Sequence, residues 1–362
     1  MREDPLLPRT ELEGLIAIPA GAIVPESLPD FKIYIPSPKG GYVLWAGDGR
    51  MVTKEKLERL AQSRQEKVFI ALGEAVKYEE YLEVHLDRIL ESDFATDEQK
   101  GEIFAKVSTN VVRSAFEHSA SGIIQRETLI RTEKLVINAL SFISEAKSLR
   151  PLARMIGNDY KTYEHSTKVL WHTVAFLNQN HDLLIEILNE YKGPQDSPTK
   201  EILMKCGVGA LLHDVGKALI DPAILNKPGP LSELEWEIVK KHPLVGLAML
   251  SDTEVPLYIT KAVVQHHENF HGGGYPLGIE RGSITILARV LRIIDTFDAM
   301  TSKRPYKDRL RPSEAIRIMV RDPTTATQTN DPRDKGMRFC FDPDLLRRFI
   351  VFLGRVRFDI DI

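Results

Sequence analysis

The chain has 362 residues, of which 43% are hydrophobic and 27% are charged, a composition typical of folded globular proteins and unlike that of disordered or fibrous chains. This length favours two domains over one, because a single core rarely grows beyond about 250–300 residues. The 48 basic and 51 acidic residues leave a net charge of −3, which argues against a nucleic-acid polymer as the partner.

The cysteine content and the hydropathy of the chain bear on its cellular location. Cys206 and Cys340 are the only cysteines, and two cysteines so far apart form neither a disulfide framework nor a thiolate metal site. No stretch approaches the roughly 18 uncharged apolar residues that a membrane span requires, and no apolar segment follows the N-terminus. We therefore expect a cytoplasmic protein without a membrane span.

Short β-rich runs dominate the first part of the chain. Residues 31–36 and 42–46 are such runs, separated by a Pro-Lys-Gly-Gly turn, and 68–72 is a further one. Thr53 is suited to cap a helix that runs to about Ser63. These features predict a small sheet with at least one helix.

From about residue 75 to 150 the apolar residues recur at three-to-four spacing, which predicts long helices. This stretch contains no cluster of histidines, cysteines or paired carboxylates. We interpret it as a helical connector or interaction surface, and we expect residues 1–145 to form an N-terminal regulatory domain of a small sheet followed by long helices.

The rest of the chain, from Asp159 to about Gly354, is predicted to be nearly all helical. Loops are expected at 192–198, 226–231 and 271–276. Ser232 and Glu235 have the spacing of a capping box, so a helix should begin there and carry His242. The predicted fold class is α+β: a small mixed α/β N-terminal domain, a helical connector and an all-α helical bundle.

His213 and Asp214 lie side by side in an apolar segment, Gly-Ala-Leu-Leu-His-Asp-Val-Gly-Lys. Burying a charged carboxylate without partners costs several kcal/mol, so this pair requires hydrogen bonds or a metal ion. The dipeptide alone is explained as well or better by a satisfied ion pair in a core.

Three further places in the helical region carry unusual polar residues. His266 and His267 are adjacent on a helix that should begin near Val255, so their side chains point about 100° apart. Both can therefore reach one site only if the site lies at the end of the helix or if it holds two metals. Asp295 lies in an apolar helix interior, and His165 lies on an amphipathic helix. Jointly, these nitrogen and oxygen donors suit iron, manganese or zinc.

Several motifs follow one another in a fixed order. They are His213-Asp214-x-Gly216-Lys217, Lys227-Pro228-Gly229, His266-His267-Glu268, Gly274-Tyr275-Pro276, Asp295-x-x-Asp298-Ala299-Met300-Thr301-Ser302 and Arg304-Pro305-Tyr306-Lys307. Over roughly 159–354 this pattern resembles the HD-GYP family of bacterial phosphodiesterases. The resemblance implies an enzyme of second-messenger signalling, with an HD-GYP domain over 151–356 that hydrolyses c-di-GMP to pGpG and further to GMP.

The resemblance also implies a ligand set for two divalent ions, with iron or manganese favoured and zinc, nickel or magnesium as alternatives. One ion would be held by His165, His213, Asp214 and Asp295, and the other by His242, His266 and His267, with Asp214 bridging the two. Ligands on separate helices can converge in this way only in the core of a bundle. Such a pair of cations lowers the pKa of a bridging water and stabilises the transition state of phosphodiester hydrolysis.

Further roles follow from the same resemblance. Asp214 and Lys217 are the expected catalytic residues, and Lys217 would contact the scissile phosphate. The expected substrate-binding residues are Lys217, Tyr275, Arg304 and Lys307, and the residues expected to support the motif are Gly274, Pro276 and Asp298.

Two positions depart from the family pattern. His271 stands where the family usually has Asp, and we expect it to support the loop, although it could also alter the loop's shape or add a ligand. Lys161 stands where some members carry a Glu for a third metal, which favours two metals. The hydrophilic insertion at 192–200 is interpreted as a surface loop.

Two alternatives to the enzyme stay open. The same pocket could serve a catalytically weak c-di-GMP sensor or interaction module, or an HD-type phosphohydrolase for another nucleotide. The partners implied are c-di-GMP as substrate, a GGDEF-type diguanylate cyclase or other signalling protein, and a second copy of the chain in a homodimer.

Overall fold

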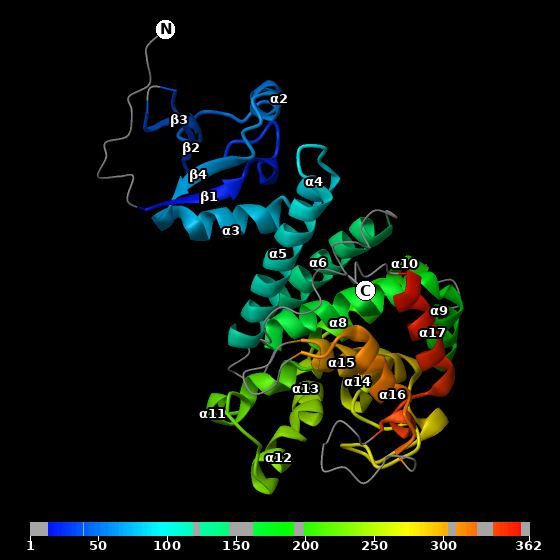
Figure 1. Ribbon diagram of the computed structural model, residues 1–362. Coiled ribbons are helices and arrows are strands. Elements are labelled where there is room, and N and C mark those ends of the chain that lie inside the picture. The colour runs from blue at the N-terminus through cyan, green and yellow to red at the C-terminus, as the bar shows by residue number, and fades with distance from the viewer. Residues whose placement is uncertain are drawn as a thin grey trace. The chain divides into compact units, whose positions relative to one another are not determined.

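The computed structural model describes residues 14–38, 40–118, 124–144, 162–191, 199–302, 309–323 and 336–355. The chain divides into two compact units, Met1–Val107 and Ser108–Ile362 (Figure 1). A four-stranded sheet lies in the first unit, and the described residues of the second form helices and their connections. The α+β class is therefore as expected, while the domain bounds 1–145 and 151–356 stay a prediction.

The sheet of the first unit has four strands: β1 Leu15–Pro19, β2 Ile33–Pro36, β3 Tyr42–Ala46 and β4 Lys67–Ala71. Their order is β1-β4-β2-β3, and every neighbouring pair is antiparallel. Strands β2, β3 and β4 lie where the sequence predicts them. The edge strand β1 was not predicted from the sequence.

Helices cover this unit and complete its core. They are η1 Ala20–Ala22, α2 Lys54–Gln62, η2 Leu72–Glu74, α3 Ala75–Val84, α4 Leu86–Glu91 and α5 Asp97–His118, the last of which runs past Val107. Thr53 caps α2 by accepting a hydrogen bond from the Lys56 N–H, as predicted. The buried Phe31 ring meets Tyr78 and Tyr81 edge to face, with ring centroids 5.8 and 5.4 Å apart.

The second unit is a helical assembly. Its further elements are α6 Arg126–Ser144, α8 Thr162–Gln179, α9 His181–Tyr191, α10 Thr199–Leu212, η5 Val215–Leu219, α11 Pro222–Leu225, α12 Glu233–Val239, α13 His242–Leu250, α14 Leu257–Gln265, η6 Arg281–Ser283, α15 Ile286–Thr301, α16 Pro312–Val320, η9 Arg338–Cys340 and α17 Pro343–Arg355. Helix α8 packs on α10 and α15, and α14 packs on α10, α13 and α15 (Figure 1). These five helices and η5 surround the polar site described below.

One helix differs from its prediction. The capping box is present, since Ser232 and Glu235 bond each other's backbone N–H, but α12 ends at Val239 and His242 begins α13 instead. The physical reason is Pro243, which has no N–H to donate to the Val239 carbonyl four residues earlier. The prediction that one helix carries His242 from Ser232 was therefore wrong.

The predicted loops at 226–231 and 271–276 are present, and the one at 192–198 lies outside the described residues. None of the described helices has the length and apolar character needed to cross a membrane.

Candidate metal centre

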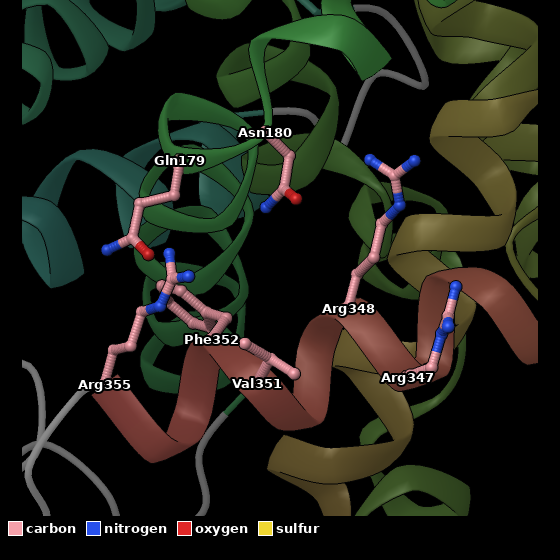
Figure 2. Close-up of a pocket in the computed structure, with 7 residues that line it drawn as sticks. All are labelled: Gln179, Asn180, Arg347, Arg348, Val351, Phe352 and Arg355. Carbon is pink, nitrogen blue, oxygen red and sulfur yellow. The ribbon is translucent and has the colours of Figure 1, made fainter.

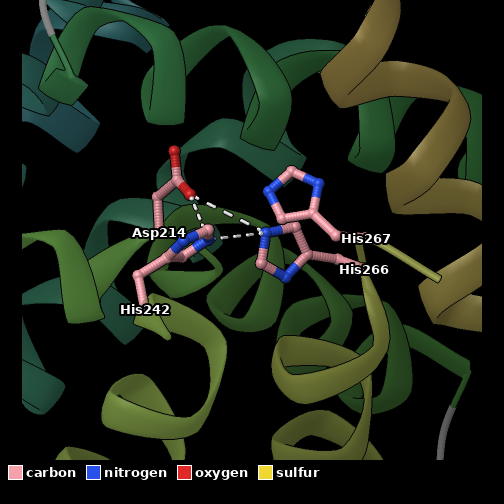
Figure 3. A group of neighbouring side chains, drawn as sticks. All are labelled: Asp214, His242, His266 and His267. Carbon is pink, nitrogen blue, oxygen red and sulfur yellow. Dashed lines mark hydrogen bonds and ion pairs between the residues drawn. The ribbon is translucent and has the colours of Figure 1, made fainter. Parts of the chain in front are cut away.

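Seven histidine and aspartate side chains gather in the second unit as two adjoining groups. One contains Asp214, His242, His266 and His267 (Figure 3), and the other contains His165, His213 and Asp295. Within each group, one potential ligand atom of every residue lies within 4.8 Å of those of the others. The structure thus brings together all seven residues that the family resemblance implies as metal ligands.

Asp214 lies between the two groups and turns one oxygen to each. Its Oδ1 is 3.2 Å from His242 Nε2 and 3.7 Å from His266 Nε2. Its Oδ2 is 3.5 Å from His213 Nε2 and 3.7 Å from His165 Nε2. This is the geometry that a carboxylate needs in order to contact two cations at once.

Three of the imidazoles are held in the same way, each at a helix end. His213 and His266 directly follow the last residues of α10 and α14, and His242 follows the break after α12. In each case Nδ1 donates a hydrogen bond to the carbonyl three residues earlier, which a helix C-terminus leaves without an intrahelical partner. The acceptors are Ala210, Val239 and Val263, at 2.8, 2.8 and 2.6 Å.

These bonds determine which ring nitrogen carries the proton. A carbonyl oxygen can only accept, so Nδ1 is protonated and the Nε2 lone pair of each neutral ring faces the site. His242 Nε2 and His266 Nε2 are only 3.3 Å apart, and His213 Nε2 has no hydrogen-bond partner among the described residues. Facing lone pairs repel unless a cation lies between them.

Protonation is a poor source of that cation. Burial lowers the pKa of His213 to about 3, and it also lowers the pKa of His242 and, strongly, that of His267. Neutral imidazoles at physiological pH, each with its second nitrogen bonded to a carbonyl, are the ligands that divalent metals take in proteins. The donor set therefore fits bound metal ions.

His165 is oriented by a different partner. Its Nδ1 is 2.7 Å from Asp298 Oδ2, which forms the carboxylate–histidine pair that commonly supports a metal ligand. Ser302 donates to the same carboxylate, and the buried Lys168 donates to Ser302 Oγ at 3.0 Å. Asp298 was expected from the sequence as a supporting residue. Lys168 was not, although its place three residues after His165 could have revealed it.

The two buried aspartates of the centre are anions. Burial alone would raise the pKa of the Asp214 carboxyl, but Lys217 and the surrounding imidazoles outweigh burial and hold it well below its usual range. Likewise, the polar contact with His165, whose Nε2 lies 3.0 Å from Asp295 Oδ1, and electrostatic attraction to the neighbouring imidazoles outweigh burial at Asp295, whose pKa is also well below its usual range. The centre thus presents carboxylates and neutral imidazoles together.

The centre is closed on most sides and open on one. The side chains of His165, His213, Asp214, His242 and His266 are at most 1% exposed. The partly exposed side chains are His267 at 14%, Asp295 at 11% and Lys217 at 15%, and Lys217 Nζ donates to Asp214 Oδ2 at 2.6 Å. Among the described residues of the centre, solvent therefore reaches these three side chains most readily.

The glycine-rich loop after His267 borders this open side. The Tyr275 ring lies 4.7 Å from the His267 ring at an interplanar angle of 31°. Glu268 holds the loop by accepting hydrogen bonds from the backbone N–H groups of Leu277 and Gly278. A Cβ on Gly274 would lie 2.3 Å from the Asn269 nitrogen, so only glycine fits there.

His271 lies in this loop but belongs to neither ligand group. Its N–H donates to the Phe339 carbonyl, and its ring meets the Phe339 ring with centroids 5.5 Å apart. Its contacts are those of a loop-supporting residue. Arg304, Lys307 and Lys161 lie outside the described residues, so their expected roles stay predictions.

A separate pocket of about 230 Å³ lies between the end of α8 and the helix α17 (Figure 2). Three arginines line it, of which Arg348 is paired with Asp182 and Asp344, and Arg347 is paired with Asp344. None of its lining residues belongs to either ligand group: they are Gln179, Asn180, Arg347, Arg348, Val351, Phe352 and Arg355.

The geometry agrees with the comparison to known families. The HD domain model matches residues 141–325, about half of the chain. The chain belongs to the HD domain family. The HD domain match covers His165, His213, Asp214, His242, His266, His267 and Asp295, and it confirms the predicted resemblance.

Curated relatives of this HD domain protein carry related names. The chain is 32% identical to cyclic di-GMP phosphodiesterase PA4108 from Pseudomonas aeruginosa, over 59% of this chain and 44% of that protein. It is 35% identical to a cyclic di-GMP phosphodiesterase from Thermotoga maritima, over 44% of this chain and 39% of that one. A 3′3′-cGAMP-specific phosphodiesterase 3 from Vibrio cholerae is 36% identical over 32% of this chain and 25% of its own.

The chain thus spans less than half the length of these curated relatives. Among solved structures, the HDG"Y"P protein Bd1817 from Bdellovibrio bacteriovorus is similar with a TM-score of 0.55 and 16% identity, covering 94% of this chain and 99% of that one. At that identity the likeness concerns the fold.

Proposed function

We propose that this HD domain protein hydrolyses the phosphodiester bonds of a cyclic dinucleotide, with c-di-GMP as the substrate. The observation that carries the proposal is the set of facing imidazole lone pairs around Asp214, open to solvent on one side. In this proposal the ligands of one metal are His165, His213 and Asp295, those of the other are His242, His266 and His267, and Asp214 bridges them.

The two divalent ions, when bound, would supply the charge that lowers the pKa of a water molecule and neutralises the phosphate. The residues of the chain have the remaining tasks. Asp214 holds the two ligand groups together, and its hydrogen bond to Lys217 places an ammonium group at the edge of the open side, within reach of a phosphate oxygen. Closure on the other sides excludes bulk water, which strengthens each of these interactions.

The neighbours of the ligands favour a rigid centre. The carbonyl-bound Nδ1 atoms and the Asp298 carboxylate leave four of the five imidazoles, those of His165, His213, His242 and His266, with one ring orientation each. The mixed nitrogen and oxygen donors, without a thiolate, favour iron or manganese. By analogy with the family, the products are pGpG and then GMP, made by a domain over 151–356 that residues 1–145 regulate.

A second candidate substrate is 3′3′-cGAMP. The chain is 36% identical to a relative named for that activity, over 117 residues. Both dinucleotides present the same cyclic phosphodiester to the metal centre, so the centre itself does not distinguish them. A GGDEF-type cyclase partner and a homodimer stay predictions from the family resemblance.

The test is turnover of both dinucleotides by protein loaded with iron or manganese without oxygen. We expect hydrolysis of c-di-GMP that is lost in Asp214→Ala and retained in Arg355→Ala, a substitution in the separate α17 pocket. Binding of c-di-GMP without turnover under every metal would contradict the proposal and favour a sensor. Faster turnover of 3′3′-cGAMP would reassign the substrate.

A further inference from the structure

An exposed tryptophan stands beside the open side of the metal centre and has no role in the proposed metal binding. Trp236, on α12, is 45% exposed. Its ring centroid lies 6.2 Å from that of Tyr275 at an angle of 77°, and Tyr275 in turn lies 4.7 Å from His267. Three rings therefore lead outward from the centre, in the order His267, Tyr275 and Trp236.

The position of Trp236 is well anchored despite its exposure. Its neighbour Glu235 closes the capping box of α12 with Ser232. Glu235 also accepts hydrogen bonds from Lys227 Nζ at 2.9 and 2.6 Å, which ties α12 to the Lys-Pro-Gly loop. An exposed ring on an anchored helix start is preorganised, so a ligand that stacks on it orders little additional chain.

We propose that Trp236 forms a nucleobase subsite, on which one purine of the substrate stacks while its phosphate lies at the metal centre; this rests on the proposed function. In a nucleotide the base is separated from its phosphate by the ribose, and Trp236 is separated from the ligand His267 by the one ring of Tyr275. Stacking on an aromatic ring tolerates either purine, since every base has a π-face. The subsite therefore accepts guanine and adenine alike.

The competing explanation is that Trp236 only supports Tyr275. A support would affect every substrate equally, whereas a base subsite affects only substrates that carry a base. The two are separated by comparing c-di-GMP with methyl 4-nitrophenyl phosphate, a diester without a nucleobase.

For Trp236→Leu we expect the kcat/KM ratio of c-di-GMP to the simple diester to fall by about ten-fold or more, because stacking on a base is lost. Trp236→Phe should recover most of this ratio. Leu234→Ala, at an 80% exposed position of the same helix, is the matched control and should leave both substrates unchanged. An equal loss on both substrates in Trp236→Leu would overturn the subsite.

Binding is measured separately by fluorescence. The chain has three tryptophans, so metal-loaded Trp45→Phe protein leaves only Trp236 and the buried Trp171. Titration with GMP should quench the emission saturably, and ribose 5-phosphate should not. Quenching without c-di-GMP hydrolysis would retain the subsite and reject the proposed function. Hydrolysis of c-di-GMP without quenching at millimolar GMP would reject the subsite and retain the proposed function.

Discussion

The two units of the chain differ in how their buried polar groups are hydrogen-bonded. In the first unit the Tyr81 hydroxyl accepts a hydrogen bond from the buried Val24 N–H and bonds Ser27 Oγ, which in turn donates to the Val24 carbonyl. In the second unit, buried atoms such as His213 Nε2 and His172 Nε2 have no such partner within the described part of the chain. Among the described residues, the buried side-chain nitrogen and oxygen atoms for which no hydrogen-bond partner is found all belong to the second unit.

Within the second unit, the atoms of this kind that belong to the two ligand groups, such as His213 Nε2, indicate where a ligand is needed. A buried polar group without a hydrogen bond costs about 1–3 kcal/mol, so a core built only for stability pairs its polar groups, as the first unit does. The second unit places facing imidazole lone pairs around an aspartate and encloses them. The closed sides of the centre pack like a core, but the facing lone pairs inside it need cations between them.

The largest expected effect is the loss of the group that joins the two halves of the centre. Asp214→Ala should abolish hydrolysis and lower metal content, with a loss greater than the roughly 10–100-fold typical of residues that only orient a ligand. Steady-state kinetics and metal analysis measure both. Retention of more than a tenth of the activity would contradict the bridging role.

Removal of the metals should lower the stability of the second unit and leave that of the first unit unchanged. Ions present at about 1,000 times their dissociation constant stabilise the folded state by about 4 kcal/mol, which chelation removes. Hydrogen exchange should therefore accelerate in peptides from 162–191 and 199–302, and stay unchanged in 14–107. Equal acceleration in both ranges would remove the distinction drawn between the units.

The residues that orient His165 should matter less than the ligands. Asp298→Asn should weaken metal binding by about 10–100-fold, because the imidazole loses its charged partner. Lys168→Met should act in the same direction through Ser302 and Asp298, and Lys168→Arg should partly restore affinity. Metal titration with a competing chelator gives the values, and unchanged affinity in Asp298→Asn would show that His165 is held by packing alone.

A close backbone contact positions His242 against Asp214. A Cβ on Gly216 would lie 2.0 Å from the His242 carbonyl oxygen, so Gly216→Ala must push α13 away from η5. We expect a loss of about 1–3 kcal/mol in the free energy of unfolding, together with weaker metal binding. Gly282→Ala, where a Cβ meets nothing within 4 Å, is the control for denaturant unfolding. A Gly216→Ala protein as stable as the control would refute this packing.

The smallest effect should come from the first unit. Tyr81→Phe leaves the buried Val24 N–H without its acceptor and should cost about 1–3 kcal/mol of stability, at the lower end because the ring stays in place. Metal affinity should be unchanged. A change in metal content of this variant would show that the two units are not independent in this respect.

Part of the fold and of the site follows directly from sequence pattern. Alternating and β-branched runs indicated β2, β3 and β4, and Thr53 marked the start of α2, because these signals are local. The family resemblance that the motifs carry implied the seven residues that the structure gathers. These residues come together through the packing of several helices. One sequence predicts that packing only through its resemblance to a known family.

The parts that could not be predicted depend on contacts between elements or on competing local signals. The capping box at Ser232 was identified correctly, but the interruption by Pro243 decides which helix carries His242. The carbonyl bonds of the imidazoles and the Lys168 contact to Ser302 depend on helix ends and on residues more than a hundred positions apart. The edge strand β1 carries too weak a strand signal to be noticed alone.

The most direct test of the account is the metal content of the full chain purified without oxygen and loaded with iron or manganese. The arrangement of Asp214 between two ligand groups predicts two equivalents per chain in the wild type and fewer in Asp214→Ala. One equivalent or none in the wild type after complete loading would contradict a two-metal centre.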